Sequence, residues 1–216
     1  MNIGISDRHA CGCTPTVARR IMGSNFCSGE EVVHHFGFDP RYLSGHEATC
    51  TPFDEQVLYR VKDTHVLALR FPILEEMHAS ILLGRRIVDA RSTKSLTFLR
   101  SKRNSVGWVL IKKTPIEEAL SKNWDEQCQL LAPFQDVPDA TSLICAAVGL
   151  FVTTGERLFP KVWVRCGDVI SQTHRFCVGA FDLDGLGIGP LLNNARAPNL
   201  AITALEKPIG CRSHAL

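Results

Sequence analysis

Residues 138–155 read PDATSLICAAVGLFVTTG, and this stretch decides the fold. Pro138 is typical of a helix start and Gly155 of a helix end, so the segment predicts one helix. Apolar residues occupy nearly every side of that helix, which indicates that protein surrounds it. The unbroken apolar run, Leu143 to Val152, has ten residues, whereas a membrane helix needs about 20. We therefore predict the central helix of a hydrophobic core.

Segments with strand character stand on both sides of this helix. THVLALRFPI (64–73) and VGWVLIKKTP (106–115) precede it, and KVWVRC (161–166) and RFCVGAFD (175–182) follow it with alternating apolar residues. We expect residues 161–184 to form a β-hairpin and LAITALE (200–206) to form a last strand. Residues 80–90 fit a strand and a helix equally well.

Short helices are predicted before these strands and between them. Thr14 with Pro15, and Ser28 with Glu31, mark the starts of helices over 14–23 and 28–37, and further helices are expected over 51–60 and 121–132. Helices mixed with antiparallel strands, without a βαβ rhythm, predict an α+β fold. We expect one domain over 14–207, in which an N-terminal helical segment packs on a mainly antiparallel sheet. Residues 1–13 are expected to be a flexible arm and 208–216 a flexible tail.

Composition narrows the class of protein. The chain has 216 residues with 24 basic and 22 acidic side chains, so its net charge of +2 creates no field that attracts nucleic acid or membrane. The first residues lack the basic and apolar regions of a secretory signal, and we expect a soluble cytoplasmic protein. Nine cysteines is an odd number, which favours reduced thiols over a disulfide framework.

One candidate metal site lies near the N-terminus. Cys11, Cys13, Cys27 and His34 supply three thiols and one imidazole, the ligand set of a structural zinc ion. Zinc sites usually begin with two cysteines two to four residues apart, however, and C-x-C is closer than that. The alternatives are a redox pair and ordinary thiols in an arm, so we expect no cofactor and keep zinc as the alternative.

The predicted hairpin carries the candidate catalytic residues. Cys166 and His174 could form a nucleophile–base pair there, with Asp182 or Asp184 as the orienting carboxylate. The alternative is that Cys166 points inward and His174 caps a turn. The following FDLDGLGIG lacks the acids and glutamate of a calcium loop, and its G-x-G-x-G spacing differs from a dinucleotide fingerprint.

Basic residues suggest an anion site. Arg157 directly follows the central helix, where it could clamp an anion or simply face the negative helix end. A run of basic side chains could bind nucleic acid, or could be a solvated charged edge: Arg85, Arg86, Arg100, Lys102 and Arg103.

Several phrases together resemble a family of uncharacterised bacterial proteins, over most of residues 28–190: EEVVHHFG, TPFDEQVLYRVKDTHVLALRFPI, GWVLIKKTP, NWDEQCQLL, TTGERLFPKVWVRCGDV and VGAFDLDGL. This resemblance implies a bacterial origin and one continuous domain, and it transfers no activity.

We therefore expect a cytoplasmic binding or interaction protein with a protein or small-molecule partner and no recognisable catalytic motif. Two alternatives are nucleic-acid binding through residues 85–103, and a small hydrolase or transferase that uses the Cys/His/Asp residues of the hairpin.

Overall fold

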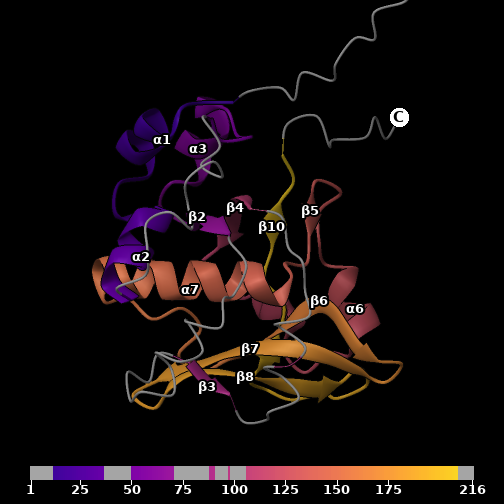
Figure 1. Ribbon diagram of the computed structural model, residues 1–216. Coiled ribbons are helices and arrows are strands. Elements are labelled where there is room, and N and C mark those ends of the chain that lie inside the picture. Colours follow the sequence, from indigo (N-terminus) through magenta and orange to yellow (C-terminus); the bar gives the residue numbers. More distant parts are fainter. Residues whose placement is uncertain (1–11, 37–49, 71–87, 91–96, 98–105, 209–216) are drawn as a thin grey trace, which may run out of the picture.

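The computed structural model describes residues 12–36, 50–70, 88–90, 97 and 106–208 (Figure 1). Helix α7 (Ala140–Thr154) crosses the middle of the molecule between two five-stranded sheets. Helices α1 (Pro15–Met22) and α3 (Glu55–Val61) cover the other face of the first sheet. The fold is α+β in four layers, which are helices α1 and α3, the first sheet, α7 and the second sheet.

Helix α7 follows the predicted bounds closely. Asp139 caps its start, because the carboxylate accepts a 2.9 Å hydrogen bond from the amide of Ser142. Gly155 ends it in the left-handed conformation with φ 77°. Every residue from Ala140 to Leu150 is buried, which confirms the prediction of a core helix. In the part of the chain that the structure describes, no helix is long and apolar enough to span a bilayer.

The first sheet has the strand order β1-β2-β4-β10-β5. Alternate residues of β2 enter two different clusters: Val66 and Ala68 pack on the side of α7, while Leu67 and Leu69 pack with α1 and α3. Burial of both faces explains why this strand is an unbroken apolar run. The strands are β1 (Phe26–Cys27), β2 (His65–Arg70), β4 (Gly107–Lys112), β10 (Leu205–Glu206) and β5 (Gln135–Asp136).

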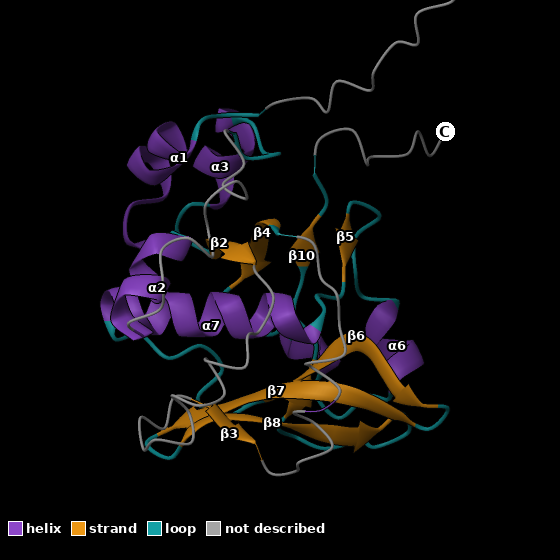
Figure 2. Cartoon of the chain, viewed as in Figure 1, coloured by secondary structure: helices purple, strands orange, loops and turns teal. Residues whose placement is uncertain are grey.

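The N-terminal helices α1 and α2 (Gly29–Phe36) begin where Thr14 and Ser28 indicate, whereas α3 begins later than the predicted 51–60, at Glu55 with Asp54 as its cap (Figure 2). A short 3-10 helix, η1 (Gly23–Asn25), follows α1. Cys13, the last residue of the expected arm, is buried, and its amide donates to the carbonyl of Phe53 over 3.1 Å. A thiol packs as a small hydrophobic group, which explains this place among α1 and α3.

The second sheet contains the predicted hairpin, which is confirmed. β6 (Trp163–Ser171) and β7 (His174–Asp182) pair antiparallel, and β8 (Gly185–Leu192) continues the meander. The strand order is β3-β8-β7-β6-β9, with β3 (Val88–Ala90) and β9 (Leu200–Ala201) as parallel edges. The inner faces of β6, β7 and β8 pack against α7.

Two expectations change in detail. The predicted last strand, 200–206, is divided: β9 belongs to the second sheet and β10 to the first, so this segment links the two sheets. The helix predicted over 121–132 is the shorter α6 (Trp124–Cys128), and its cap is Asn123 rather than Ser121. The 3-10 helix η3 (Glu117–Ala119) lies just before it.

Candidate functional site

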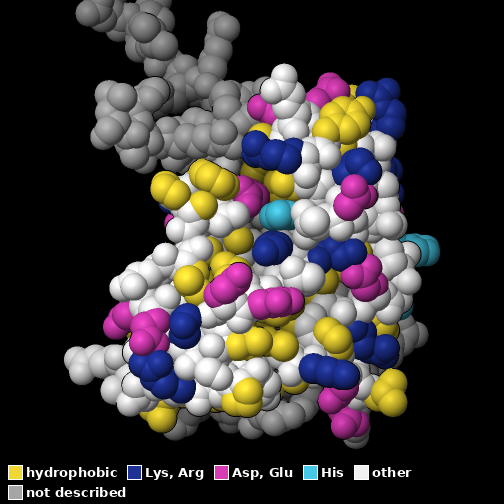
Figure 3. All heavy atoms as spheres, turned by 180° about the vertical axis from the view of Figure 1, so that it is seen from behind, with side chains coloured by type: hydrophobic (Ala, Val, Ile, Leu, Met, Phe, Trp, Pro, Cys, Tyr) yellow, Lys and Arg dark blue, Asp and Glu magenta, His cyan; other side chains and the backbone are white. Residues whose placement is uncertain are grey.

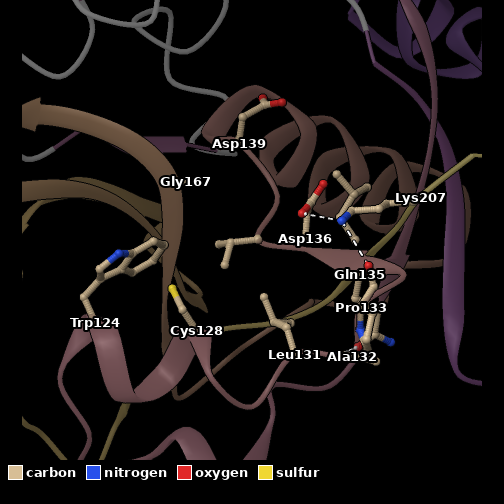
Figure 4. A pocket seen from close by; sticks show the side chains of 12 residues that line it. Trp124, Cys128, Leu131, Ala132, Pro133, Gln135, Asp136, Asp139, Gly167 and Lys207 are labelled. Carbon is tan, nitrogen blue, oxygen red and sulfur yellow. Dashed lines mark hydrogen bonds and ion pairs between the residues drawn. The ribbon is translucent and has the colours of Figure 1, made fainter. Parts of the chain in front are cut away.

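A groove of about 570 Å³ lies where β5, at the edge of the first sheet, approaches β6 of the second (Figure 4). The amide of Gly167 in β6 donates to the carbonyl of Pro138 over 3.0 Å, which joins β6 to the segment between β5 and α7. Helix α6, the segment 131–137, β6 and β10 form the walls. The lining residues are Trp124, Cys128, Leu131, Ala132, Pro133, Gln135, Asp136, Val137, Asp139, Gly167, Leu205 and Lys207.

The wall from α6 is held in place by a capping box and an arginine. The side chain of Asn123 accepts from the amide of Glu126, whose carboxylate accepts from the amide of Asn123. The guanidinium of Arg175 lies 3.7 Å from the ring centroid of Trp124 and donates to the carbonyl of Gly167. This cation–π contact fixes the indole at the groove.

The opposite wall carries polar side chains, and the charges of Lys207 and Asp136 on it balance each other. The ammonium of Lys207 lies 3.2 Å from the carboxylate of Asp136 and donates to the carbonyl of Pro133, as the dashed lines in Figure 4 show in part. Gln135 donates to Glu206 over 2.7 Å and accepts from the amide of Ala132. These contacts order the segment that forms the wall.

The start of α7 borders the groove but is already occupied by carboxylates. Asp139 accepts from Ser142 and pairs with Arg70 over 3.1 Å, and buried Asp168 accepts a 2.6 Å hydrogen bond from the amide of Ala140. Carboxylates at this end of the helix satisfy its amides and its positive dipole. The groove therefore does not favour an anion at this place.

Apolar side chains stand around the groove. Leu130 is 37% exposed and Phe134 is 42% exposed; both are next to lining residues in the sequence, although neither side chain is part of the lining. Seen from behind, hydrophobic side chains flank a hollow at the left edge of the molecule, and acidic and basic groups are interspersed elsewhere (Figure 3). We call this groove, with its lining residues, the α6 groove.

Cys128 brings a thiol to the α6 groove. Burial raises the pKa of the Cys128 thiol, although the charges of Arg175 and Arg165 act in the opposite direction. A protonated thiol is a weak nucleophile. None of the described residues that line the groove is a histidine, which could act as a base toward the Cys128 thiol.

A buried arginine, which the sequence reasoning missed, lies on the other side of α6. The side chain of Arg165 is fully buried and donates to Gln127, to the carbonyl of Lys122, and to the carbonyls of Leu192 and Ala195. The only signal in the sequence is its position in the alternating strand KVWVRC, on the same face as Trp163.

The structure does not bring the predicted catalytic residues together. Cys166 is buried on the inner face of β6 against α7, and His174 lies beside Thr173 at the turn that starts β7. Asp182 and Asp184 lie at the opposite end of β7, about 26 Å along the strand from His174 at ~3.3 Å per residue. The proposed Cys/His/Asp site is therefore corrected: a hairpin pairs residues across strands but separates those at its two ends.

The candidate zinc ligands are separated as well. Cys13 packs with α1 and α3, and Cys27 packs on the other face of the first sheet with α7. His34 is exposed, and Cys11 lies outside the described residues. In the part of the chain that the structure describes, the cysteines in the reduced form are Cys13, Cys27, Cys128, Cys145, Cys166 and Cys177. Within the described ranges, no group of three metal-ligating side chains gathers.

Of the candidate anion-binding residues, the structure describes Arg157 and does not describe those of 85–103. Arg157 is half-buried, with its guanidinium carbon 4.8 Å and 5.6 Å from the ring centroids of Phe151 and Phe181. The rings thus account for its position beside the end of α7. The basic residues of 85–103, which are Arg85, Arg86, Arg100, Lys102 and Arg103, lie outside the described residues.

A buried polar chain crosses the first sheet near the groove. The hydroxyl of Thr64 is 2.9 Å from Nδ1 of His65, whose Nε2 is 3.4 Å from Oε1 of Glu206. Hydroxyl, imidazole and carboxylate thus follow one another, as in a triad. The same 2.9 Å contact recurs between Thr173 and His174 on an exposed turn. It therefore results from adjacency in the sequence and does not identify a nucleophile.

Compared with known proteins, the chain matches no family model, no curated protein and no solved structure. The geometry of the α6 groove is thus the basis for assigning a function.

Proposed function

We propose that the protein is a cytoplasmic binding protein that holds a segment of a partner polypeptide in the α6 groove and catalyses no reaction on it. One observation carries this proposal: an open groove is lined by apolar side chains, Trp124 and Leu131 among them, together with paired polar groups, and the exposed Leu130 and Phe134 are next to lining residues in the sequence. Aromatic anchors surrounded by polar groups are typical of protein interfaces.

The charges in the groove support a polypeptide over nucleic acid as the ligand. Lys207 is paired with Asp136, and Arg175 is stacked on Trp124, so these cations are already engaged. Nucleic-acid binding needs cations that are free to replace counterions at phosphates. Binding through residues 85–103 remains a separate prediction, which charge reversal of Arg100, Lys102 and Arg103 tests.

A peptide-display selection on the immobilised protein, followed by titration of the selected peptides in solution, tests the proposal. Phe134→Ser removes the exposed ring between the lining residues Pro133 and Gln135, and Tyr59→Ser removes a ring that is 54% exposed on α3. We expect the first substitution to weaken peptide binding at least about tenfold and the second to leave it unchanged.

The proposal is wrong if the selected peptides bind both variants with equal affinity. A gel shift with short RNA that disappears on charge reversal of residues 100–103, together with no selected peptide, would instead support the nucleic-acid alternative. Neither substitution touches the core, so melting temperatures should remain close to that of the wild type.

A further inference from the structure

The outer face of the second sheet contains a slot with a glycine floor. In β8, Leu186 and Ile188 point inward to α7, so Gly185, Gly187 and Gly189 fall on the outer face. Three alternate positions of one strand therefore carry no side chain on this face. The G-x-G-x-G spacing that resembles a nucleotide motif is thus a feature of a strand.

Trp163 accounts for one of these glycines. A Cβ atom at Gly187 would lie 2.6 Å from Cη2 of Trp163 and 2.9 Å from the carbonyl oxygen of Gly179. The indole therefore extends from β6 across β7 to β8, close to the backbone. Only glycine at position 187 allows this approach.

Gly189 has no such neighbour. A Cβ atom built there would meet no atom of the described residues within 4 Å, and the φ angle of Gly189 lies outside the left-handed region. Directly above it is a pocket of about 360 Å³, bordered by Trp163, Pro190, Ala195, Ala197 and Leu200. We call this pocket the Trp163 slot. It is separate from the α6 groove, with which it shares no lining residue.

Hydrogen bonds fix the walls of the Trp163 slot. The carbonyl of Ala195 accepts from buried Arg165 over 2.6 Å, and the carbonyl of Ala197 accepts from the amide of Ser121 over 3.0 Å. The amide of Trp163 donates to the carbonyl of Asn199 over 2.8 Å. A cavity whose walls are held in this way does not need to be ordered by its ligand.

The lining defines the chemistry of the occupant. Among the residues that the structure describes, no charged side chain borders the slot, and its polar groups are the amide of Asn199 and the indole of Trp163. Small residues at the floor and one wall leave a space beside an indole, a shape that suits a flat ring. The volume is at the low end of the range for ligand pockets, which limits the ring system to one or two fused rings.

We propose that the Trp163 slot binds an uncharged planar aromatic or heteroaromatic molecule, in contact with the indole of Trp163 and the backbone of Gly189. This binding is independent of the polypeptide in the α6 groove.

Saturation-transfer NMR and titration with indole as the probe test this proposal, with cyclohexanol as a non-planar probe of similar polarity. Gly189→Val places an isopropyl group in the open floor, and Ala132→Val adds two methyl groups to the α6 groove as the matched control. We expect indole to bind the wild type and the control alike, Gly189→Val to weaken it at least about tenfold, and cyclohexanol to bind more weakly than indole.

The proposal is overturned if indole does not bind at millimolar concentration, if Gly189→Val binds it as the wild type does, or if Ala132→Val loses it equally. Should Gly189→Val fold poorly, Ala197→Leu narrows the slot from the opposite wall and must give the same loss of indole binding. Failure of the α6 groove is detected separately, because Phe134→Ser leaves the Trp163 slot intact.

Discussion

The guanidinium of Arg165 donates to the side-chain oxygen of Gln127 over 2.7 Å, and neither side chain is exposed to solvent. The amide nitrogen of Gln127 in turn donates to the carbonyls of Ala119 and Leu200. This pair connects β6 with α6, η3 and β9. Because α6 borders the groove and Ala195 borders the slot, one buried cation supports both candidate sites.

Arg165→Met should therefore lower the free energy of unfolding by about 3–5 kcal/mol, since several buried acceptors lose their donor. Arg165→Lys should recover only part of this loss, because an ammonium cannot reach four acceptors on two sides. Urea unfolding measures both variants. Equal stability of Arg165→Met and the wild type would contradict a structural role for the cation.

Two buried thiols make the protein sensitive to alkali. Burial raises the pKa of Cys27 to about 12 and that of Cys177 to about 12, whereas an exposed thiol ionises near ~8.5. The contribution of these two thiols to the free energy of unfolding is fully present below pH ~8.5. It falls as the pH rises from there toward 12, because in this range the thiols of the unfolded chain lose their protons and those of the folded chain do not. Each thiol contributes a slope of about 1.4 kcal/mol per pH unit.

Urea unfolding at pH 8, 9 and 10 measures that slope. We expect Cys177→Ala to be less stable than the wild type at pH 8, because it leaves a cavity, and to lose less stability between pH 8 and pH 10. A thiol reagent at pH 8 should label Cys128, which is half-buried, before Cys177. Parallel stability curves for the two proteins would contradict the assignment.

Glu206 makes an opposite contribution in acid. Burial alone would raise its pKa, but contacts with His65 and Gln135 outweigh burial and hold the pKa below its ordinary value. The stability that it provides is present above ~4.5 and is lost as the pH falls through the lowered pKa. Glu206→Gln should thus be less stable than the wild type at pH 7, with a smaller difference at pH 3. A difference that is constant with pH would refute this.

The sequence predicts those parts of the fold that short patterns determine. Helix α7 has Pro138 before it and Gly155 after it, and the β6–β7 hairpin alternates within each strand. The division of 200–206 between two sheets is not visible locally, because it depends on which distant strand each half meets. An arginine between Val164 and Cys166 suggests an exposed side chain, and its partner Gln127 lies 38 residues away.

The candidate sites were less predictable than the fold, because they too depend on contacts between residues that are distant in the sequence. The sequence pointed to thiols, histidines and acids that are close along the chain, and the structure separates Cys166 from Asp182 and Cys13 from Cys27. The α6 groove and the Trp163 slot are instead formed by residues from several elements, most of them apolar or small. Such residues carry no chemical signature until the fold brings them together.

Gly187 and Gly189 offer a matched test of the structure around Trp163. A Cβ atom at position 187 would overlap the indole and the carbonyl of Gly179, whereas one at position 189 enters open space. Gly187→Ala should lower the free energy of unfolding by about 1–3 kcal/mol, the usual cost of overpacking. Gly189→Ala should change it by less than about 0.5 kcal/mol. Trp163 emission, recorded with Trp108 and Trp124 replaced by phenylalanine, should shift to longer wavelength in Gly187→Ala only. If both variants are equally stable with unchanged emission, the indole does not lie across β8.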